Sequence, residues 1–594
     1  MFKIQREVAY AILLLLLLTG CKERNQVSTE ITLKKPNVIL IMADDQGWGD
    51  LSFHGNTNLN TPNIDAIAKN GVSFTNFFVQ PVCSPTRAEL LTGKYFNRLG
   101  VHGTSAGGER MDFSVPTIAE ILRENGYQTA AFGKWHNGMQ PPYHPNARGF
   151  DEFYGFASGH WGNYFSPLLE HNGELVQGSG FLTDDLADHS IDFMKANKDN
   201  PFFIYLPLNT PHSPMQVPNP YWDRFKNKEL KMTYQNPEAE NILFTRAALA
   251  MVENIDDNVG RILENLERLD LEENTIVIYL SDNGPNGWRW NGGMRGRKGS
   301  TDEGGVKTPF FIQWKDHIKM GTKVQSIGGA IDITPTLLGL LEIPKNDLQM
   351  DGKNLAPLIW DPGATFEDRI LYNHWEGHTS LRTQDFRLDH ENRLYEMNSD
   401  PGQKQDVSDK FQVLRDSLIR EREKWLTQYP PLTHTSDTRP FTLGHPKYKF
   451  TQLPARDGVP SGKIERSNRF PNNTFFSQWT QARDSIFWDV DVLKKGKYQV
   501  TLYYSLPKDN EGVELILSQG KNILVKMLDT VHDPPLKGME NDRVERMESY
   551  IKDFKPIDMG IISLDAKRTP LVLKANRMKS SGPEVRLLQF ERVD

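Results

Sequence analysis

Four apolar runs recur along the chain, and each of them ends directly in polar or ionisable residues. The runs span residues 37–42, 128–133, 202–208 and 275–280. Helical patterns separate them: between residues 248 and 266, apolar side chains recur in steps of three and four, the spacing of one helix face. Continuous apolar runs are typical of strands covered on both faces. Strands that alternate with amphipathic helices predict an α/β fold, a mostly parallel sheet sandwiched by helices.

The residues that follow these runs predict where an active site lies. In open α/β sheets, ligands bind beyond the carboxyl ends of the strands. In chain order, the segments after the four runs carry Asp44 and Asp45, then Lys134 and His136, then His212, then Asp282 and Asn283. Polar residues after a single strand would be ordinary loop chemistry, but their recurrence after all four strands favours one shared site.

The acidic residues at this edge indicate a cation. The residues that offer hard oxygen ligands are Asp44, Asp45, Asp282 and Asn283. Calcium and magnesium prefer such oxygens, and no His/Cys cluster in the sequence suggests zinc. We therefore expect Ca²⁺, with Mg²⁺ as the second candidate. The alternative is that Asp-Asp and Asp-Asn-Gly serve only as turn and cap residues, which is a common role for them.

Cys83 opens a segment with unusual chemistry. The segment reads Cys-Ser-Pro-Thr-Arg-Ala-Glu-Leu-Leu-Thr-Gly-Lys, and it places Pro85 where a first-turn proline belongs. Cys83 is therefore predicted at or just before a helix N-terminus, where backbone N–H groups and the helix dipole favour a bound anion. Arg87, about one turn along, is expected to face the same point. A buried structural cysteine before a helix is the alternative.

The motif Cys83-x-Pro85-x-Arg87, followed by Leu-Thr-Gly, resembles the signature of type I sulfatases. The resemblance extends from about residue 36 to about residue 429. It implies an alkaline-phosphatase-like fold and the hydrolysis of sulfate esters, with sulfated carbohydrates as the expected substrates and inorganic sulfate as a product. It also implies that a separate maturation enzyme oxidises Cys83 to Cα-formylglycine, whose hydrated gem-diol is the nucleophile.

The same resemblance assigns roles to the other motif residues. It implies a metal set of Asp44, Asp45, Cys83, Asp282 and Asn283, and a catalytic set of Cys83, Arg87, Lys134, His136, His212 and Lys298. The Arg and Lys side chains are expected to place fixed positive charge around the sulfate. His212 is expected to protonate the departing sugar oxygen, and His136 to take the proton of the second diol hydroxyl. Trp288 and Trp290, after the second metal pair, are expected either to stack on sugar rings or simply to pack.

Two other functions remain open at this stage. One is a phosphatase or phosphodiesterase that shares the sulfatase fold, and the other is a noncatalytic glycan-binding lipoprotein. The chain has 69 Lys and Arg against 76 Asp and Glu, a net charge of −7, and this gives no electrostatic footprint for nucleic acid. The expected partners are a sulfated glycan or oligosaccharide, the maturation enzyme and a membrane that holds a lipid anchor.

The N-terminus predicts export. Basic residues precede an almost pure leucine run at 11–18, which is shorter than the ~20 residues of a membrane span. Leu18-Thr19-Gly20-Cys21 resembles a bacterial lipobox, with residues 1–20 as the signal peptide and 21–35 as a tether. The expected location is the lipid-anchored cell envelope, on the periplasmic face or at the cell surface. A plain cleaved signal or an uncleaved anchor is the alternative.

The rest of the chain is predicted to fold as four further parts. The catalytic α/β domain is expected at 36–364, a smaller antiparallel C-terminal subdomain with a helix at 365–430, a Pro/Thr-rich linker at 431–450 and a β-sandwich at 451–594. The sandwich is predicted from strict alternation of apolar and polar residues, as between 498 and 505. A carbohydrate-binding and a purely structural role for it are both open.

Overall fold

The central sheet is built around the four expected strands. A computed structural model describes residues 34–344 and 348–594. The four strands are β1 (Asn37–Ala43), β4 (Gln128–Lys134), β8 (Phe202–Pro207) and β9 (Thr275–Ser281). They lie in the order β9-β1-β8-β4, and every neighbouring pair is parallel. The carboxyl ends that carry the predicted site residues therefore share one edge, as the sequence predicted.

Six further strands extend this sheet on both sides. On the β4 side lie β5 (Glu152–Phe156), parallel to β4, and the antiparallel strands β6 (Leu168–His171) and β7 (Glu174–Gln177). On the β9 side lie β10 (Phe310–Gln313), β2 (Val72–Phe74) and β11 (Thr322–Val324). Because β10 runs antiparallel to both of its neighbours, the ten-stranded sheet is mixed at its margins and parallel at its centre.

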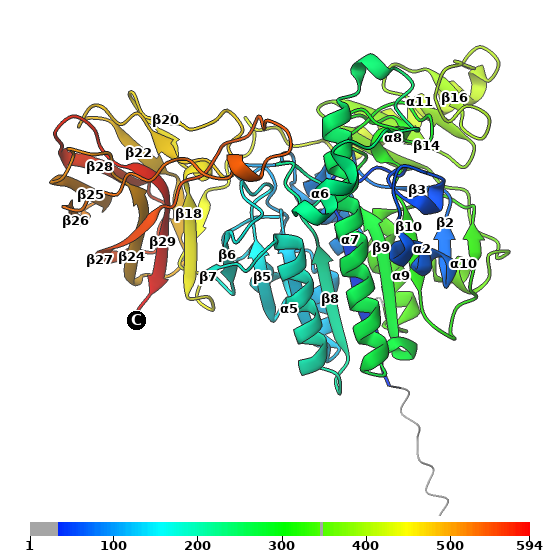
Figure 1. Cartoon of the computed structure of the whole chain (residues 1–594), viewed down its shortest axis with the longest axis horizontal. Helices are drawn as coiled ribbons and strands as arrows, with labels where there is room; N and C mark the ends of the chain where they lie inside the picture. The colour runs from blue at the N-terminus through cyan, green and yellow to red at the C-terminus, as the bar shows by residue number, and fades with distance from the viewer. Residues whose placement is uncertain (1–33, 345–347) are drawn as a thin grey trace, which may run out of the picture. The chain divides into compact units, whose positions relative to one another are not determined.

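Helices cover both faces of the sheet. All seven residues of β1 are buried, and alternate side chains enter two different cores. One core includes helices α2 (Pro62–Lys69), α5 (Leu182–Ala196) and α7 (Ile242–Arg268), and Figure 1 shows α5 and α7 beside β8. The other includes α3 (Cys83–Thr92), α4 (Ile118–Glu124), α9 (Ile333–Leu340) and α10 (Ala356–Trp360). The period-two alternation explains why β1 is apolar throughout.

The smaller subdomain is a four-stranded antiparallel sheet with one long helix. Its strands are β13 (Leu371–Trp375), β14 (His378–Arg382), β15 (Phe386–Leu388) and β16 (Leu394–Glu396), and its helix is α11 (Gln412–Gln428). Leu418 of α11 packs against Leu381 and Leu388 of the sheet. A buried ion pair, Arg387 Nη2 to Glu303 Oε2 at 3.0 Å, joins the subdomain to the short helix α8 (Glu303–Val306).

The C-terminal part forms two facing sheets around one core. One sheet has the order β20-β21-β29-β24-β27 with β18 beside β29, and the other has the order β19-β22-β28-β25-β26. The short strands are β19 (Val459–Pro460), β20 (Glu465–Arg466), β21 (Phe476–Ser477) and β22 (Ser485–Trp488). The long strands are β18 (Phe450–Pro454), β24 (Gly496–Ser505), β25 (Val513–Gln519), β26 (Asn522–Leu528), β27 (Lys555–Leu564), β28 (Leu571–Arg577) and β29 (Glu584–Arg592). In β24, Tyr498, Val500 and Leu502 are buried as the alternation predicted.

The predicted linker contains a strand, and most of the predicted N-terminal segments lie outside the described residues. The interval 431–450 contains β17 (Phe441–Leu443), which pairs with β23 (Val490–Val492), and Leu443 enters the sandwich core. The predicted signal peptide, Cys21 and the tether up to residue 33 lie outside the described residues. In the described part of the chain, no helix combines the length and the apolar character that a membrane crossing needs.

Candidate active site

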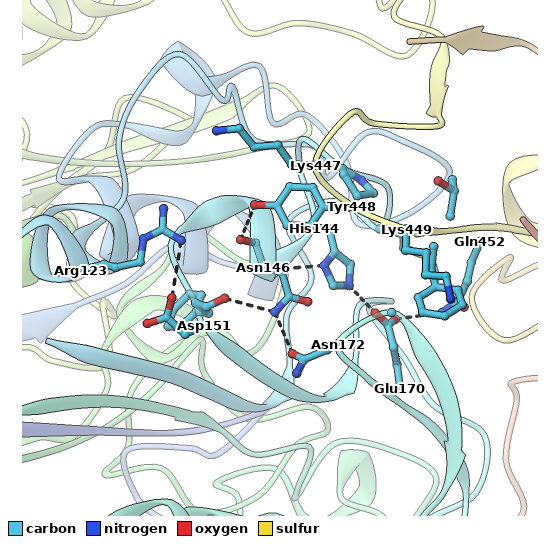
Figure 2. A pocket seen from close by; sticks show the side chains of 16 residues that line it. Arg123, His144, Asn146, Asp151, Glu170, Asn172, Lys447, Tyr448, Lys449 and Gln452 are labelled. Atoms are coloured by element: carbon cyan, nitrogen blue, oxygen red, sulfur yellow. Dashed lines mark hydrogen bonds and ion pairs between the residues drawn. The ribbon is translucent and has the colours of Figure 1, made fainter. Parts of the chain in front are cut away.

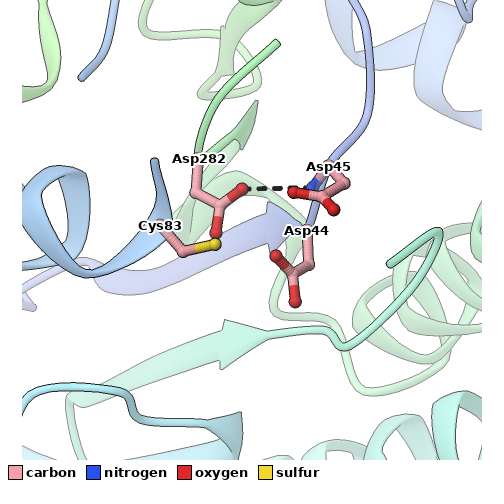
Figure 3. A group of neighbouring side chains, drawn as sticks. All are labelled: Asp44, Asp45, Cys83 and Asp282. Atoms are coloured by element: carbon pink, nitrogen blue, oxygen red, sulfur yellow. Dashed lines mark hydrogen bonds between the residues drawn. The ribbon is translucent and has the colours of Figure 1, made fainter. Parts of the chain in front are cut away.

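Three carboxylates and the Cys83 thiol meet at the carboxyl edge of the sheet. One ligand atom from each of Asp44, Asp45, Cys83 and Asp282 lies within 4.8 Å of the others, and all four residues are buried (Figure 3). Asp45 adopts a left-handed backbone, with φ of 67°. Its N–H donates to Asp282 Oδ1 at 3.2 Å, so the ends of β1 and β9 are joined directly. Asn283 lies beside them and donates from Nδ2 to Asp45 Oδ1 at 2.8 Å.

The cluster fits a hard cation. Within residues 34–344 and 348–594, Asp44 Oδ1 and Asn283 Oδ1 are buried without a hydrogen-bond partner. Burial and the neighbouring Asp44 carboxylate raise the pKa of Asp282 to about 6. Asp44 Oδ1 and Asn283 Oδ1 are therefore acceptors without a hydrogen bond, and unpaired buried acceptors are costly. A divalent ion that prefers carboxylate and amide oxygens would satisfy them.

Three basic side chains surround the carboxylates. Arg87 donates from Nε and Nη2 to Asp282 Oδ2 at 3.1 and 2.7 Å. Lys134 Nζ lies 2.7 Å from Asp44 Oδ2, and Lys298 Nζ lies 2.7 Å from Asp45 Oδ1. Burial opposes the charged forms, but these cations hold the pKa values of Asp44 and Asp45 below their usual range. The site therefore places three buried carboxylates among three basic side chains. The metal-binding and sulfate-binding roles given to these residues stay predictions.

Cys83 is the first residue of α3, preceded by the extended residue Val82. Pro85 lies in the first turn, as expected, and the helix ends at Gly93, whose φ is 70°. The Cys83 side chain is buried, and burial together with Asp282 raises the pKa of its thiol to about 12. The unmodified thiol is therefore protonated near neutral pH and is a poor nucleophile.

Asn137 supports the start of this helix. Its side chain is buried, and Nδ2 donates to the carbonyl oxygen of Ser84 at 3.2 Å. It is not among the residues that line the pocket above Cys83. Its position beside the motif Gly-Lys-Trp-His therefore serves α3 rather than a ligand.

The two predicted histidines have defined hydrogen bonds. His136 Nε2 lies 2.8 Å from the carbonyl oxygen of Thr104, so it carries the proton and leaves Nδ1 as the acceptor. Burial and Lys134 hold the pKa of His136 well below its ordinary value, so the ring is neutral. His212 donates from Nδ1 to the Ser213 carbonyl oxygen at 2.6 Å, and its Nε2 lies 3.7 Å from Asp45 Oδ2. Burial and Lys298 lower the pKa of His212.

A cavity of about 350 Å³ opens above Cys83. It brings together the predicted residues Cys83, His136, His212 and Lys298. Its other lining residues include several that the sequence analysis did not single out: Thr104, His160, Asn286, Trp375, Phe470, Asn472, Met547 and Glu548. His160 follows β5, a strand that was not among the four expected from the sequence, and it lies further from the end of its strand than His136 does from the end of β4. The residues beyond 450 carry no sequence signal that links them to Cys83.

Trp288 lines an adjoining cavity of about 290 Å³ and not the one above Cys83. The Trp288 ring stacks on the Tyr234 ring, with 4.7 Å between the ring centroids. The guanidinium carbon of Arg297 lies over the Trp288 ring, 4.9 Å from its centroid. Arg289 is buried and bonded to Asp50, with Nη2 at 2.6 Å from Oδ2. Of the Trp288-Arg289-Trp290 group, therefore, Arg289 is structural and Trp288 faces a cavity next to the site.

A separate cavity of about 380 Å³ lies away from Cys83, and none of its lining residues is a predicted site residue. In Figure 2, His144 points toward Glu170, and these two side chains are bonded. The other Glu170 oxygen accepts from Gln452 Nε2 at 3.0 Å. Tyr448 donates to the Asn146 carbonyl oxygen at 2.8 Å. These polar groups satisfy one another's hydrogen bonds. The cavity lies between the α/β domain and the sandwich, because its lining residues come from 123–173 and from 447–452.

The parallel sheet, its oxygen-rich cluster and the ring of Arg and Lys define an alkaline-phosphatase-like hydrolase of anionic esters. The family comparison narrows this class. The sulfatase family model matches residues 36–343, and the model of the N-sulphoglucosamine sulphohydrolase C-terminal region matches residues 298–428. The chain belongs to the sulfatase family, and it is a sulfuric ester hydrolase.

Individual relatives agree with this assignment. The chain is 31% identical over 373 residues to human N-acetylgalactosamine-6-sulfatase, covering 57% of this chain and 68% of that protein. The chain in the crystal structure of Ps i-CgsB in complex with k-i-k-neocarrahexaose is 32% identical in sequence, with a TM-score of 0.60. The match covers 66% of this chain and 93% of that one. The PsFucS1 sulfatase from Pseudoalteromonas sp. is 25% identical with a TM-score of 0.55, covering 67% and 92%.

Proposed function

We propose that this sulfatase acts on sulfated carbohydrates, with Cys83 converted to formylglycine and Ca²⁺ held by Asp44, Asp45, Asp282 and Asn283. The observation that carries the proposal is the position of Cys83. It starts α3 against three buried carboxylates that Arg87, Lys134 and Lys298 surround. Relatives described as N-acetylgalactosamine-6-sulfatase and as a carrahexaose complex support a carbohydrate substrate.

When present, the two groups would supply a hydroxyl nucleophile at position 83 and Lewis-acid stabilisation of sulfate charge. The residues of the chain supply the rest. Arg87, Lys134 and Lys298 orient the sulfate and stabilise the charge that shifts in the transition state. Each of the three forms an ion pair with a buried carboxylate, so their positions are fixed before substrate binds.

The histidines divide the proton transfers. His212 would protonate the departing sugar oxygen from Nε2, because its Nδ1 is already committed to the Ser213 carbonyl. An arriving sulfate ester adds negative charge beside the ring and favours this protonated form. His136 would accept a proton at Nδ1, which is the free nitrogen of a neutral ring. This acceptance would release sulfate and regenerate the aldehyde.

The proposal extends to processing and place. The conversion of Cys83 requires a maturation enzyme, for which the motif Cys83-x-Pro85-x-Arg87 would be the recognition segment. The leucine run and Leu18-Thr19-Gly20-Cys21 support export and lipid anchoring in a bacterial cell envelope. Radiolabelled fatty acid would be incorporated into the full-length protein and lost in the Cys21→Ala variant if this part is right.

The test of the function is made at Cys83. Enzyme produced with a formylglycine-generating enzyme should release sulfate from a panel of monosulfated hexoses and hexosamines. The peptide that contains residue 83 should be lighter in mass than its cysteine form. Cys83→Ala should lose sulfate release entirely and keep its thermal unfolding temperature, because the side chain is small and starts a helix. Turnover by Cys83→Ala would overturn the covalent mechanism.

A further inference from the structure

Part of the active-site pocket comes from the sandwich. Phe470 and Asn472 lie between β20 (Glu465–Arg466) and β21 (Phe476–Ser477), and Met547 and Glu548 lie in the long connection from β26 to β27. All four line the cavity above Cys83. The sulfatase family models end at residue 428. This wall of the pocket therefore belongs to the individual chain and not to the matched family region.

The β26–β27 connection is fixed against the segment that follows His212. Arg546 is buried, and its Nη2 lies 2.5 Å from Asp542 Oδ1. Gln216 Nε2 donates to the same Asp542 oxygen at 2.8 Å and to the Gly538 carbonyl at 2.9 Å. Arg543 N–H donates to the Met215 carbonyl at 2.9 Å. These bonds fix the connection immediately before residues 547 and 548.

Glu548 puts a negative charge on this wall. The Ser213 hydroxyl donates to Glu548 Oε1. Burial opposes ionisation, but the Ser213 hydrogen bond favours the carboxylate and holds the pKa of Glu548 below its ordinary value. Among the described residues that line the cavity, Glu548 is the one carboxylate. The cavity thus has Lys298 near Cys83 and a permanent anion on the wall that the sandwich contributes.

His160 is a polar group without a partner on the same wall. Its side chain belongs to a residue that is 6% exposed, and within the described chain neither ring nitrogen has a hydrogen-bond partner. Its ring centroid lies 5.5 Å from that of His212. Burial lowers the pKa of His160 to about 3, so it offers one N–H donor and one acceptor. A buried imidazole with two free positions implies a ligand that supplies them.

We propose that Glu548 and His160 form a sugar subsite that binds a neutral hydroxyl or amide N–H and rejects a second anionic group. The proposal rests on the sulfatase function above and specifies its substrate class. A hydroxyl or N–H donates to the Glu548 carboxylate, and His160 completes the hydrogen bonds. A second sulfate or a uronate carboxylate would face the Glu548 charge in a largely buried pocket, where repulsion is poorly screened. Substrates that carry one charge are therefore preferred.

The experiment compares matched substrates in the full-length, formylglycine-bearing enzyme. The probes are the monosulfated sugar with the highest wild-type turnover in the panel and the same sugar with a second sulfate. Wild type should prefer the monosulfated sugar. Glu548→Gln should lower kcat/KM for the monosulfated sugar about 10-fold, because a charge-assisted bond becomes a neutral one. It should also raise the ratio of disulfated to monosulfated kcat/KM about 10-fold, because the repulsion is removed.

Glu545→Gln is the matched control. Glu545 is exposed on the same connection and does not line the cavity above Cys83, so its variant should keep the wild-type ratio. If Glu548 had a merely structural role, Glu548→Gln would lower kcat/KM equally for the two substrates. An unchanged ratio of disulfated to monosulfated kcat/KM in this variant would overturn the subsite. Glu548→Asp separates an effect of charge from a loss of thermal stability. It keeps the negative charge, so it should keep the wild-type ratio of disulfated to monosulfated kcat/KM. If modified wild type hydrolyses no sulfated sugar, the proposed function itself fails, whatever the variants do.

Discussion

At the scale of single residues, the site holds buried acceptor oxygens, Asp44 Oδ1 and Asn283 Oδ1, that a divalent cation would satisfy. Asp44, Asp45 and Asp282 lie together, and the pKa of Asp282 is raised to about 6. In the metal-free protein, the folded state therefore holds a proton that the unfolded chain has lost. The contribution of Asp282 to stability is therefore present below about pH 4, the unfolded pKa, and is lost as pH rises to about 6. The buried neutral histidines His136 and His160 contribute stability that grows over the same range.

Calcium should remove this loss. Chelation should abolish sulfate release and lower the unfolding temperature at pH 7 more than at pH 5. Added Ca²⁺ should restore both, with a gain of about 2.7 kcal/mol at 100 times its dissociation constant. Calorimetry with and without chelator measures the effect. Asp282→Ala should lose activity and the calcium response together, and stoichiometric zinc in the purified protein would contradict the assignment.

The two histidines should respond differently to the leaving group. A nitrophenolate leaves without help, whereas a sugar alkoxide needs a proton in the transition state. His212→Ala should therefore lower kcat about 10²- to 10⁴-fold on sugar sulfates and far less on nitrophenyl sulfate. His136→Ala should instead accumulate a sulfated residue 83, visible by mass, whichever substrate delivers the sulfate. Equal losses on both substrates, with no adduct in the His136 variant, would refute the division.

Most of the predicted site residues lie at or shortly after the ends of strands, so the sequence predicted that they share one edge of the sheet. Asp44, Lys134, His212 and Asp282 have positions fixed by β1, β4, β8 and β9. Arg87 and Cys83 were predictable from a helix start. His160 was missed because a lone histidine in a loop is ordinary, and its importance depends on burial and on the absence of hydrogen bonds within the described chain.

At the scale of elements, the edge of the sheet works because neighbouring strand ends fit closely. Gly159, after β5, lies against His136 of the β4 segment: a Cβ there would be 2.1 Å from His136 Nε2. Gly159→Ala should displace the imidazole and break its bond to Thr104, and such overpacking typically costs about 1–3 kcal/mol. Sulfate release should fall at least about 10-fold. Gly363→Ala, which meets only Asp361 Oδ1 at 3.3 Å, should leave turnover unchanged.

The four central strands were predictable from their continuous apolar runs, and α7 was predictable from apolar side chains that recur in steps of three and four. The margins of the central sheet were not. β10, β2 and β11 are short strands whose pairing depends on contacts distant in sequence, such as Phe311 beside Ser73. Similarly, β17 is three residues long, and it is a strand because β23 offers it an edge. Local alternation carries no information about such partners.

At the scale of the whole molecule, the sandwich reaches His136 through a chain of hydrogen bonds. Arg456 is buried and paired with Glu109 of the α/β domain. Its Nη1 donates to Asn472 Oδ1 at 2.6 Å, and Asn472 Nδ2 donates to the Thr104 carbonyl at 3.1 Å. The same carbonyl accepts from His136. Sequence patterns predicted a sandwich but not this connection, because its links are single polar residues from distant segments.

Arg456→Ala should therefore impair both stability and turnover. It leaves Glu109 buried and unpaired, which typically costs about 3–5 kcal/mol. It also frees Asn472 and so loosens the carbonyl that orients His136. Glu109→Ala combined with Arg456→Ala should be less destabilised than the sum of the single variants, measured by denaturant unfolding. Arg568→Ala, which removes an exposed pair with Asp489 inside the sandwich, is the control and should change neither property. If Arg456→Ala unfolds more easily but the folded enzyme releases sulfate at the wild-type rate, the sandwich stabilises the enzyme without positioning its catalytic residues.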